Sequence, residues 1–176
     1  MSAEISACGQ YRYVLTRPAR QVRPMASAAV FCMLNPSIAD AVKDDPTIRR
    51  LRGFSEAWDC NGFVVVNLYA LRATDPKALR AHADPVGPFN DDWLYWVARE
   101  HREIVCAWGK NARPDRERAA IDIFRRAGAK LWCLELTKDG TPKHPLYLRG
   151  DLRPVLYAPV SSNSAAERKE GESWTM

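Results

Sequence analysis

Amide, indole and imidazole side chains stand where apolar runs of this sequence end, and together they could do chemistry. Asn35, Asn67 and Trp108 each close or follow such a run, and His144 lies in a later loop that is rich in glycine and proline. An amide both accepts and donates hydrogen bonds, so it can orient a water molecule or pair with the edge of a base. A histidine held in a fixed turn can donate a hydrogen bond to a developing anion.

Each of these residues also has an ordinary structural interpretation. Asn35 could close an Asx-turn before Pro36, and neighbouring backbone groups could satisfy the amide of Asn67. His144, alone in a loop, could be a surface residue. The sequence leaves both kinds of interpretation open.

Neighbouring residues extend the candidate site. Ser37 and Asp40 follow Asn35 closely, and Asp40 could polarise a water molecule or be a solvated acid. Tyr69 could stack on a planar ring or be an aromatic residue of the core. Lys110 could bind phosphate, although solvated lysines are common on any surface.

Apolar periodicity predicts the elements that would position these residues. Segments 11–16 and 28–34 are apolar and flanked by prolines, which indicates strands, with a hairpin at one edge of a sheet as one arrangement. Asp45 before Pro46 favours the start of a helix, whose apolar residues recur as far as Trp58. The pattern then predicts strands at 63–68, 104–108 and 130–136, and helices that begin at Asp75-Pro76, at Asp91 or Asp92, and at Pro114.

Strands that alternate with helices at this spacing are typical of a parallel sheet with right-handed crossovers. We therefore predict an α/β fold, a three-layer α/β/α sandwich with a mainly parallel central sheet and an antiparallel N-terminal edge strand. Ligands bind such sheets beyond the carboxyl ends of the strands, where the candidate residues fall. We predict one domain over residues 1–160 and a disordered tail over the polar residues 161–176.

Composition narrows the class of protein. The chain has 176 residues, 47% of them hydrophobic, which suits one core, and its net charge of +5 permits a polyanionic partner without indicating one. Of its five cysteines, four lie in or beside apolar runs without metal-ligand spacing, so we expect buried thiols rather than disulfides or zinc. Since no stretch is long and apolar enough for a membrane helix and no secretory pattern is present, we expect a soluble, cytoplasmic protein with no membrane partner.

Several motifs together resemble one known family. They are residues 33–41 (MLNPSIADA), 44–50 (DDPTIRR), 66–76 (VNLYALRATDP), Trp108-Gly109, 136–138 and 144–148. Over roughly residues 10–155 the chain closely resembles the domain-of-unknown-function family DUF1643. That resemblance implies no activity.

The chain is more distantly similar to the uracil/thymine-DNA glycosylase superfamily, which also has an α/β/α sandwich. An apolar strand followed by Asn-Pro looks like the first motif of mismatch-specific glycosylases, in which the residue matching Asn35 positions the attacking water. Asn67, the segment from Gly109 and His144-Pro145 resemble later motifs in the same order. The block at residues 44–50 has no counterpart in that pattern, and Leu146 is the obvious candidate for a minor-groove wedge.

The resemblance implies a uracil-DNA-glycosylase-like hydrolase of the N-glycosidic bond to a nucleobase, in DNA or in a nucleotide, with no metal and no cofactor. On this hypothesis Asn35, Asp40 and His144 have catalytic roles, and the substrate is bound by Pro36, Ser37, Asn67, Tyr69, Trp108 and Lys110. A flipped base would stack on Tyr69 and be held by Asn67. Two alternatives stay open: a non-catalytic module that binds a modified base or nucleotide, and a metal-dependent nucleotide-processing enzyme in which Asp44 and Asp45 gather a divalent ion.

Overall fold

The computed structural model describes residues 1–37 and 44–159. Asp40 and the predicted tail at 161–176 lie outside the described residues. Within them the helices are α1 (Pro46–Ala57), α2 (Pro76–Ala81), α3 (Asn90–His101) and α4 (Pro114–Arg126), with a short 3₁₀ helix, η1 (Pro145–Tyr147). The strands are β1 (Ser2–Ile5), β2 (Arg12–Pro18), β3 (Ala29–Met33), β4 (Gly62–Asn67), β5 (Glu103–Cys106), β6 (Lys130–Cys133) and β7 (Val155–Leu156).

The strands of the described chain form one seven-stranded mixed sheet in the order β1-β2-β4-β3-β5-β6-β7. Strands β4, β3, β5 and β6 run parallel, while β1 and β2 at one side and β7 at the other are antiparallel to their neighbours. The predicted α/β fold with a parallel centre and antiparallel N-terminal edge strands is therefore confirmed.

The predicted hairpin between segments 11–16 and 28–34 is wrong. Strand β2 pairs with β4, and β3 lies inside the sheet between β4 and β5. Every residue of β3 is buried, and a strand with apolar side chains on both faces suits the centre of a parallel sheet. The short strands β1 and β7 were not predicted, because two to four residues carry too little periodicity.

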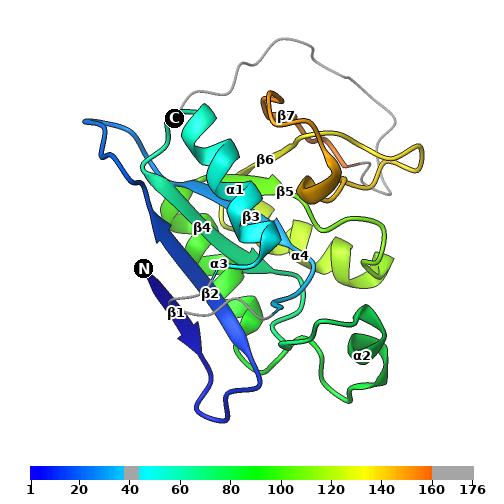
Figure 1. Ribbon diagram of the computed structural model, residues 1–176. Helices are drawn as coiled ribbons and strands as arrows, with labels where there is room; N and C mark the ends of the chain where they lie inside the picture. The colour runs from blue at the N-terminus through cyan, green and yellow to red at the C-terminus, as the bar shows by residue number, and fades with distance from the viewer. Residues whose placement is uncertain (38–43, 160–176) are drawn as a thin grey trace.

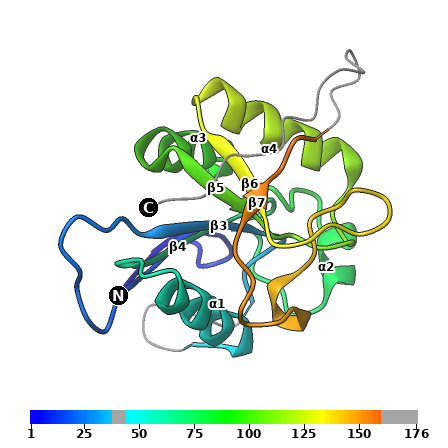
Figure 2. The same ribbon diagram turned by 90° about the horizontal axis from the view of Figure 1, so that it is seen from above.

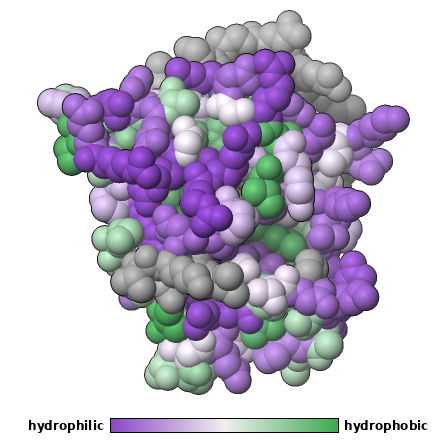
Figure 3. Space-filling view, viewed as in Figure 1, coloured by the Kyte–Doolittle hydropathy of each residue, from purple (hydrophilic) through white to green (hydrophobic). Residues whose placement is uncertain are grey.

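Two helical layers cover the sheet, as Figures 1 and 2 show. Alternate residues of β3 enter opposite cores: Val30 and Cys32 pack with residues of α3 and α4, and Phe31 packs with residues of α1. The buried side of α1 consists of Ile48, Leu51, Phe54 and Ser55. Its other side contributes to the mostly hydrophilic face in Figure 3, as expected of an amphipathic helix.

Local sequence explains where the helices start. The Asp45 side chain accepts a hydrogen bond from the N–H of Ile48, and Pro46 occupies the first turn of α1. Asp75 caps α2 in the same way. Helix α3 begins at Asn90, slightly before the predicted start, with Asp91 and Asp92 in its first turn rather than at the cap. No helix in the described ranges is both long and apolar enough to cross a membrane.

Candidate functional site

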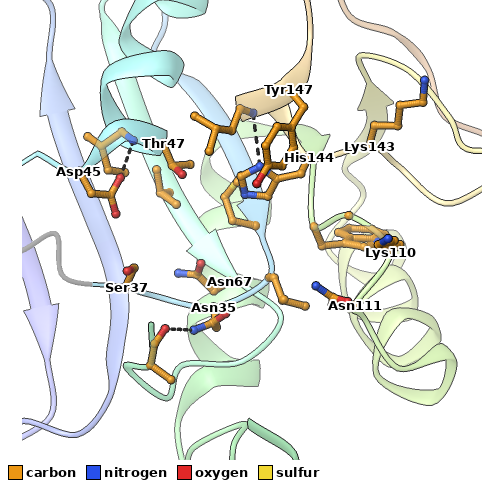
Figure 4. A pocket seen from close by; sticks show the side chains of 18 of the residues that line it. Asn35, Ser37, Asp45, Thr47, Asn67, Lys110, Asn111, Lys143, His144 and Tyr147 are labelled. Carbon is orange, nitrogen blue, oxygen red and sulfur yellow. Dashed lines mark hydrogen bonds between the residues drawn. The ribbon is translucent and has the colours of Figure 1, made fainter. Parts of the chain in front are cut away.

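A cavity of about 840 Å³ opens beyond the carboxyl ends of the parallel strands. Strand β4 lies on one side of β3, and β5, which comes later in the chain, lies on the other side. Strand order therefore reverses at β3, and sheets of this kind bind ligands at such a reversal. Figure 4 shows the side chains that converge there. The polar residues of the lining are Arg12, Asn35, Ser37, Asp45, Thr47, Asn67, Thr74, Lys110, Asn111, Thr137, Lys143 and His144.

Asn35 follows β3 and is held rigidly at the cavity wall. Its Nδ2 donates to the carbonyl oxygens of Pro36 at 2.9 Å and Ala73 at 2.7 Å. These two bonds fix which way the amide faces, and no described residue donates to Oδ1. Instead of an Asx-turn, the structure presents Asn35 with an acceptor oxygen that can take a hydrogen bond from water or a ligand.

Asn67 ends β4 and is only 1% exposed. Its Nδ2 has no hydrogen-bond partner among the described residues, so neighbouring backbone groups do not satisfy it. An unpartnered polar group of this burial costs about 1–3 kcal/mol. Since Asn67 lines the cavity, a ligand there could supply the missing partner.

His144 presents a neutral imidazole at the same cavity. The N–H of Leu146 donates to Nδ1 at 3.3 Å, so Nδ1 is the acceptor and the proton of the neutral ring is on Nε2. Burial lowers the pKa of His144, and the opposite effect of Asp45 is smaller. At neutral pH the ring therefore offers an N–H donor rather than a full positive charge.

Gly109 allows the loop of His144 to lie close to the end of β5. Its φ is +73°, and a Cβ at this position would come within 3.2 Å of the Cβ of His144. The N–H of Gly109 also donates to the carbonyl of Pro142 at 2.9 Å. Any side chain here would push against the loop, so the glycine positions His144.

The block at residues 44–50 contributes two polar lining residues that the predicted site lacked, Asp45 and Thr47. Asp44 does not join them. Its Oδ1 lies 2.7 Å from Nε of Arg17, and its Oδ2 lies 3.2 Å from Nη2 of Arg52. Burial alone would raise the pKa of Asp44, but the two arginines outweigh it and lower the pKa. A carboxylate held by two guanidinium groups is a poor cation ligand, so the pair at 44–45 does not fit a divalent-ion site.

The aromatic residues are arranged differently from the prediction. Tyr69 is 4% exposed, does not line the large cavity, and its hydroxyl accepts a hydrogen bond from the N–H of Arg113 at 3.4 Å. Trp108 does line the cavity and is 1% exposed. The prominent aromatic at the cavity is Tyr147, which is 84% exposed and lies 5.9 Å from the His144 ring. Its position directly after His144-Pro145-Leu146 is the signal that could have found it.

Of the remaining predicted residues, some line the cavity and others do not. Ser37 and the exposed Lys110 line the cavity. Pro36 is buried behind the wall and contributes only its carbonyl oxygen, which accepts from Asn35 and from the N–H of Ala73. Asp40 lies outside the described residues.

Comparison with known families identifies the group to which this arrangement belongs. A family model described as "Protein of unknown function (DUF1643)" matches residues 12–146. The chain belongs to the DUF1643 family. The matched DUF1643 region spans the lining from Arg12 to Leu146, so nearly the whole cavity is part of the family's domain. Comparisons with curated proteins and with solved structures gave no match, and none of these findings supports a link to the uracil-DNA glycosylase superfamily.

Proposed function

We propose that this DUF1643 protein hydrolyses the N-glycosidic bond between a nucleobase and its sugar, in DNA or in a nucleotide. The observation that carries the proposal is the convergence of Asn35, Asn67 and His144 from three separate segments on one cavity. Each brings a different hydrogen-bonding group: a fixed acceptor, an unpartnered buried donor and a neutral imidazole N–H.

The reaction needs groups on both sides of the bond that breaks. As the bond between the anomeric carbon and the base nitrogen lengthens, positive charge builds on the sugar and negative charge on the base. Nε2–H of His144 stabilises the departing base by donating to it. Oδ1 of Asn35 accepts a hydrogen bond from the water whose oxygen bonds to the anomeric carbon. The water supplies a hydroxyl to the sugar and a proton, through solvent, to the released base.

The other lining residues suit binding. Nδ2 of Asn67 donates to an acceptor on the base edge, since that pairing removes the cost of its unmet hydrogen bond. Trp108 contributes a buried aromatic side chain to the lining, and Tyr147 offers an exposed ring against which a base can stack. The ammonium group of Lys110 is available to a phosphate on the ligand.

A non-catalytic binding module is the second candidate, favoured by one observation. Asn35 is an amide, so it can orient water but cannot take a proton from it. A module that senses a base or nucleotide would use the same cavity and give saturable binding without product. Release of a free base distinguishes the two functions.

The test is mass-spectrometric detection of free bases after incubation with the full chain. Substrates are single- and double-stranded DNA carrying uracil, mismatched thymine or modified pyrimidines, together with free nucleosides and nucleotides. We expect release that Asn35→Ala abolishes.

Asn61→Ala is the matched control. Its Nδ2 also donates to two backbone carbonyls, those of Arg23 at 2.7 Å and Ala26 at 2.8 Å, but Asn61 does not line the cavity. The control therefore loses the same two kinds of hydrogen bond, and also one that Oδ1 accepts from the N–H of Arg23 at 2.7 Å, and it should retain activity. No release from any substrate, or equal activity in Asn35→Ala, contradicts the proposal.

A further inference from the structure

The start of α1 forms a wall of the cavity that the proposed reaction leaves unused. Asp45 and Thr47 both line the cavity. In Figure 4 they lie on the opposite side from Asn35 and Asn67, with His144 and Tyr147 beside them. The wall thus places a carboxylate and a hydroxyl across from the two amides.

We propose that Asp45 and Thr47 bind the hydroxyl groups of a ribose, so that the ligand of this cavity is a ribonucleoside or ribonucleotide rather than DNA. The inference rests on the proposed function for the presence of a base attached to a sugar. It adds which sugar the site selects, because DNA has no 2′-hydroxyl and its 3′-oxygen is esterified.

Asp45 is the first support for this subsite. It is only 9% exposed, and one carboxylate oxygen accepts the N–H of Ile48 at 2.8 Å as the cap of α1. In the described parts of the chain no cation pairs with it, in contrast to Asp44 beside it. Because a buried carboxylate needs donors, its second oxygen is suited to accept from a ligand hydroxyl.

The charge of the lining favours a hydroxyl over a cationic ligand as that donor. Asp45 is the one acid of the described lining, whereas Arg12, Lys110 and Lys143 contribute cations, of which Lys143 pairs with Glu135 at 2.7 Å. A cationic ligand would be repelled by that excess, but a neutral diol would not. In other α/β sheets a carboxylate near the strand ends binds a ribose hydroxyl in this way, and Thr47 adds a group that both donates and accepts.

A second, independent observation indicates that a ligand occupies this cavity. Asn67, 1% exposed, lines it with an Nδ2 that no described residue satisfies. The volume of about 840 Å³ lies within the range of about 300–1,000 Å³ that small-molecule sites span. A single nucleotide therefore suits this cavity, with its base toward Asn67 and its sugar toward Asp45.

The experiment is calorimetric titration of the full chain with uridine, cytidine, adenosine and guanosine, with their 5′-monophosphates, and with the 2′-deoxy forms of all of these. For the ribonucleoside or ribonucleotide that binds most tightly, we expect removal of the 2′-hydroxyl to weaken binding at least about tenfold, as a hydrogen bond to a charged group predicts. In Asp45→Asn the ratio should fall toward one, because the amide oxygen still caps α1 while the charge is gone.

Asp75→Asn is the control, since Asp75 caps α2 through the N–H of Lys77 and does not line the cavity. It should retain the wild-type ratio. Thr47→Val, which removes only the hydroxyl, replaces Asp45→Asn if the latter fails to fold by circular dichroism, and it should also lower the ratio.

Three outcomes overturn the subsite: equal binding of ribose and deoxyribose forms, a ratio unchanged in both variants, or no binding of any nucleoside or nucleoside monophosphate. Its failure is distinct from failure of the proposed function. Ribose-selective binding without base release leaves the subsite standing and removes the hydrolase. Base release from DNA without ribose selectivity does the reverse.

Discussion

Replacing Gly109 by alanine should destabilise the protein and displace His144. Two costs add at this position. Its φ of +73° is unfavourable for any residue with a Cβ, and that Cβ would lie 3.2 Å from the Cβ of His144, closer than ordinary carbon contacts of about 3.5–4.0 Å. The histidine Cβ is attached directly to backbone, so the loop itself has to move.

Gly140 separates these two costs. Its φ is +79°, but an added Cβ would meet no heavy atom within 4 Å. Gly140→Ala therefore loses only the backbone term, about 1–2 kcal/mol. Gly109→Ala should lower the free energy of unfolding through the same backbone effect and also through overpacking, which costs about 1–3 kcal/mol, so that the two together cost about 2–5 kcal/mol. The reduced entropy of the unfolded chain offsets both substitutions equally, so it cancels in the comparison.

The assay is equilibrium urea unfolding followed by tryptophan fluorescence, with the free energy of unfolding compared between the two variants. Gly109→Ala should lose at least about 1 kcal/mol more than Gly140→Ala. It should also shift the imidazole NMR signals of His144, which Gly140→Ala should leave in place. Equal losses of stability with unchanged imidazole signals would refute the reasoning that Gly109 positions this loop.

Three further predictions concern ionisable groups. Asp44→Asn should cost about 3 kcal/mol at pH 7, because it removes the carboxylate that pairs with the fully buried Arg17. The pKa of Asp44 is lower in the folded state than in the unfolded state. The stabilisation by its carboxylate is therefore present above the unfolded pKa of about 3.9 and is lost as pH falls through the folded pKa. Acid unfolding curves of wild type and variant should converge there. His144 should titrate below about 6.5 in NMR, with its neutral proton on Nε2. Because its folded-state pKa is lowered, stability should fall as pH drops through about 6.5, and His144→Gln should flatten that slope. Of the five thiols, the exposed Cys8 should react first with a disulfide reagent, because the hydrogen bond with Ser6 lowers its pKa while burial raises the pKa of the other four.

Each of these predictions has a contradicting result. A difference between Asp44→Asn and wild type that persists unchanged after Asp44 is protonated in the folded state would show that the ion pair is not its source. A His144 pKa above its ordinary value would mean that Asp45 outweighs burial. Fast reaction of two or more thiols in the folded protein, or of one thiol in Cys8→Ser, would contradict the buried assignment.

The sequence predicted the parallel centre of the fold because its strands are strongly apolar and its helices begin with recognisable caps. Asp45-Pro46 and Asp75-Pro76 both start helices where expected. The strand that pairs with β2 could not be predicted from the order of strands in the sequence. Strand β3 is buried on both faces and takes neighbours from later in the chain, which leaves β2 to pair with β4.

The sequence could predict those residues of the candidate site that follow the ends of strands. Asn35, Asn67, Trp108 and His144 all line the cavity, because the carboxyl ends of parallel strands share one edge of the sheet. Tyr69 was misplaced because sequence alternation does not say whether a residue after a strand turns toward the cavity or the core. Asp45 was predicted as a cap and, in one alternative, as a metal ligand, but not as a residue that binds substrate, although a side chain at a helix start can both cap and line a cavity.

The block at residues 44–50, which the proposed reaction does not itself require, makes physical sense as a unit that holds and lines the cavity. Asp44 ties the approach to α1 to β2 through Arg17 and to α1 itself through Arg52. Arg50 donates a hydrogen bond to the carbonyl of Leu148, at the end of η1. The helix is thereby joined to the segment that carries His144. Since Asp45 lies between these anchors, its carboxylate is fixed relative to the imidazole of His144. The proposed subsite requires this, because it has to orient the sugar while the base departs beside it.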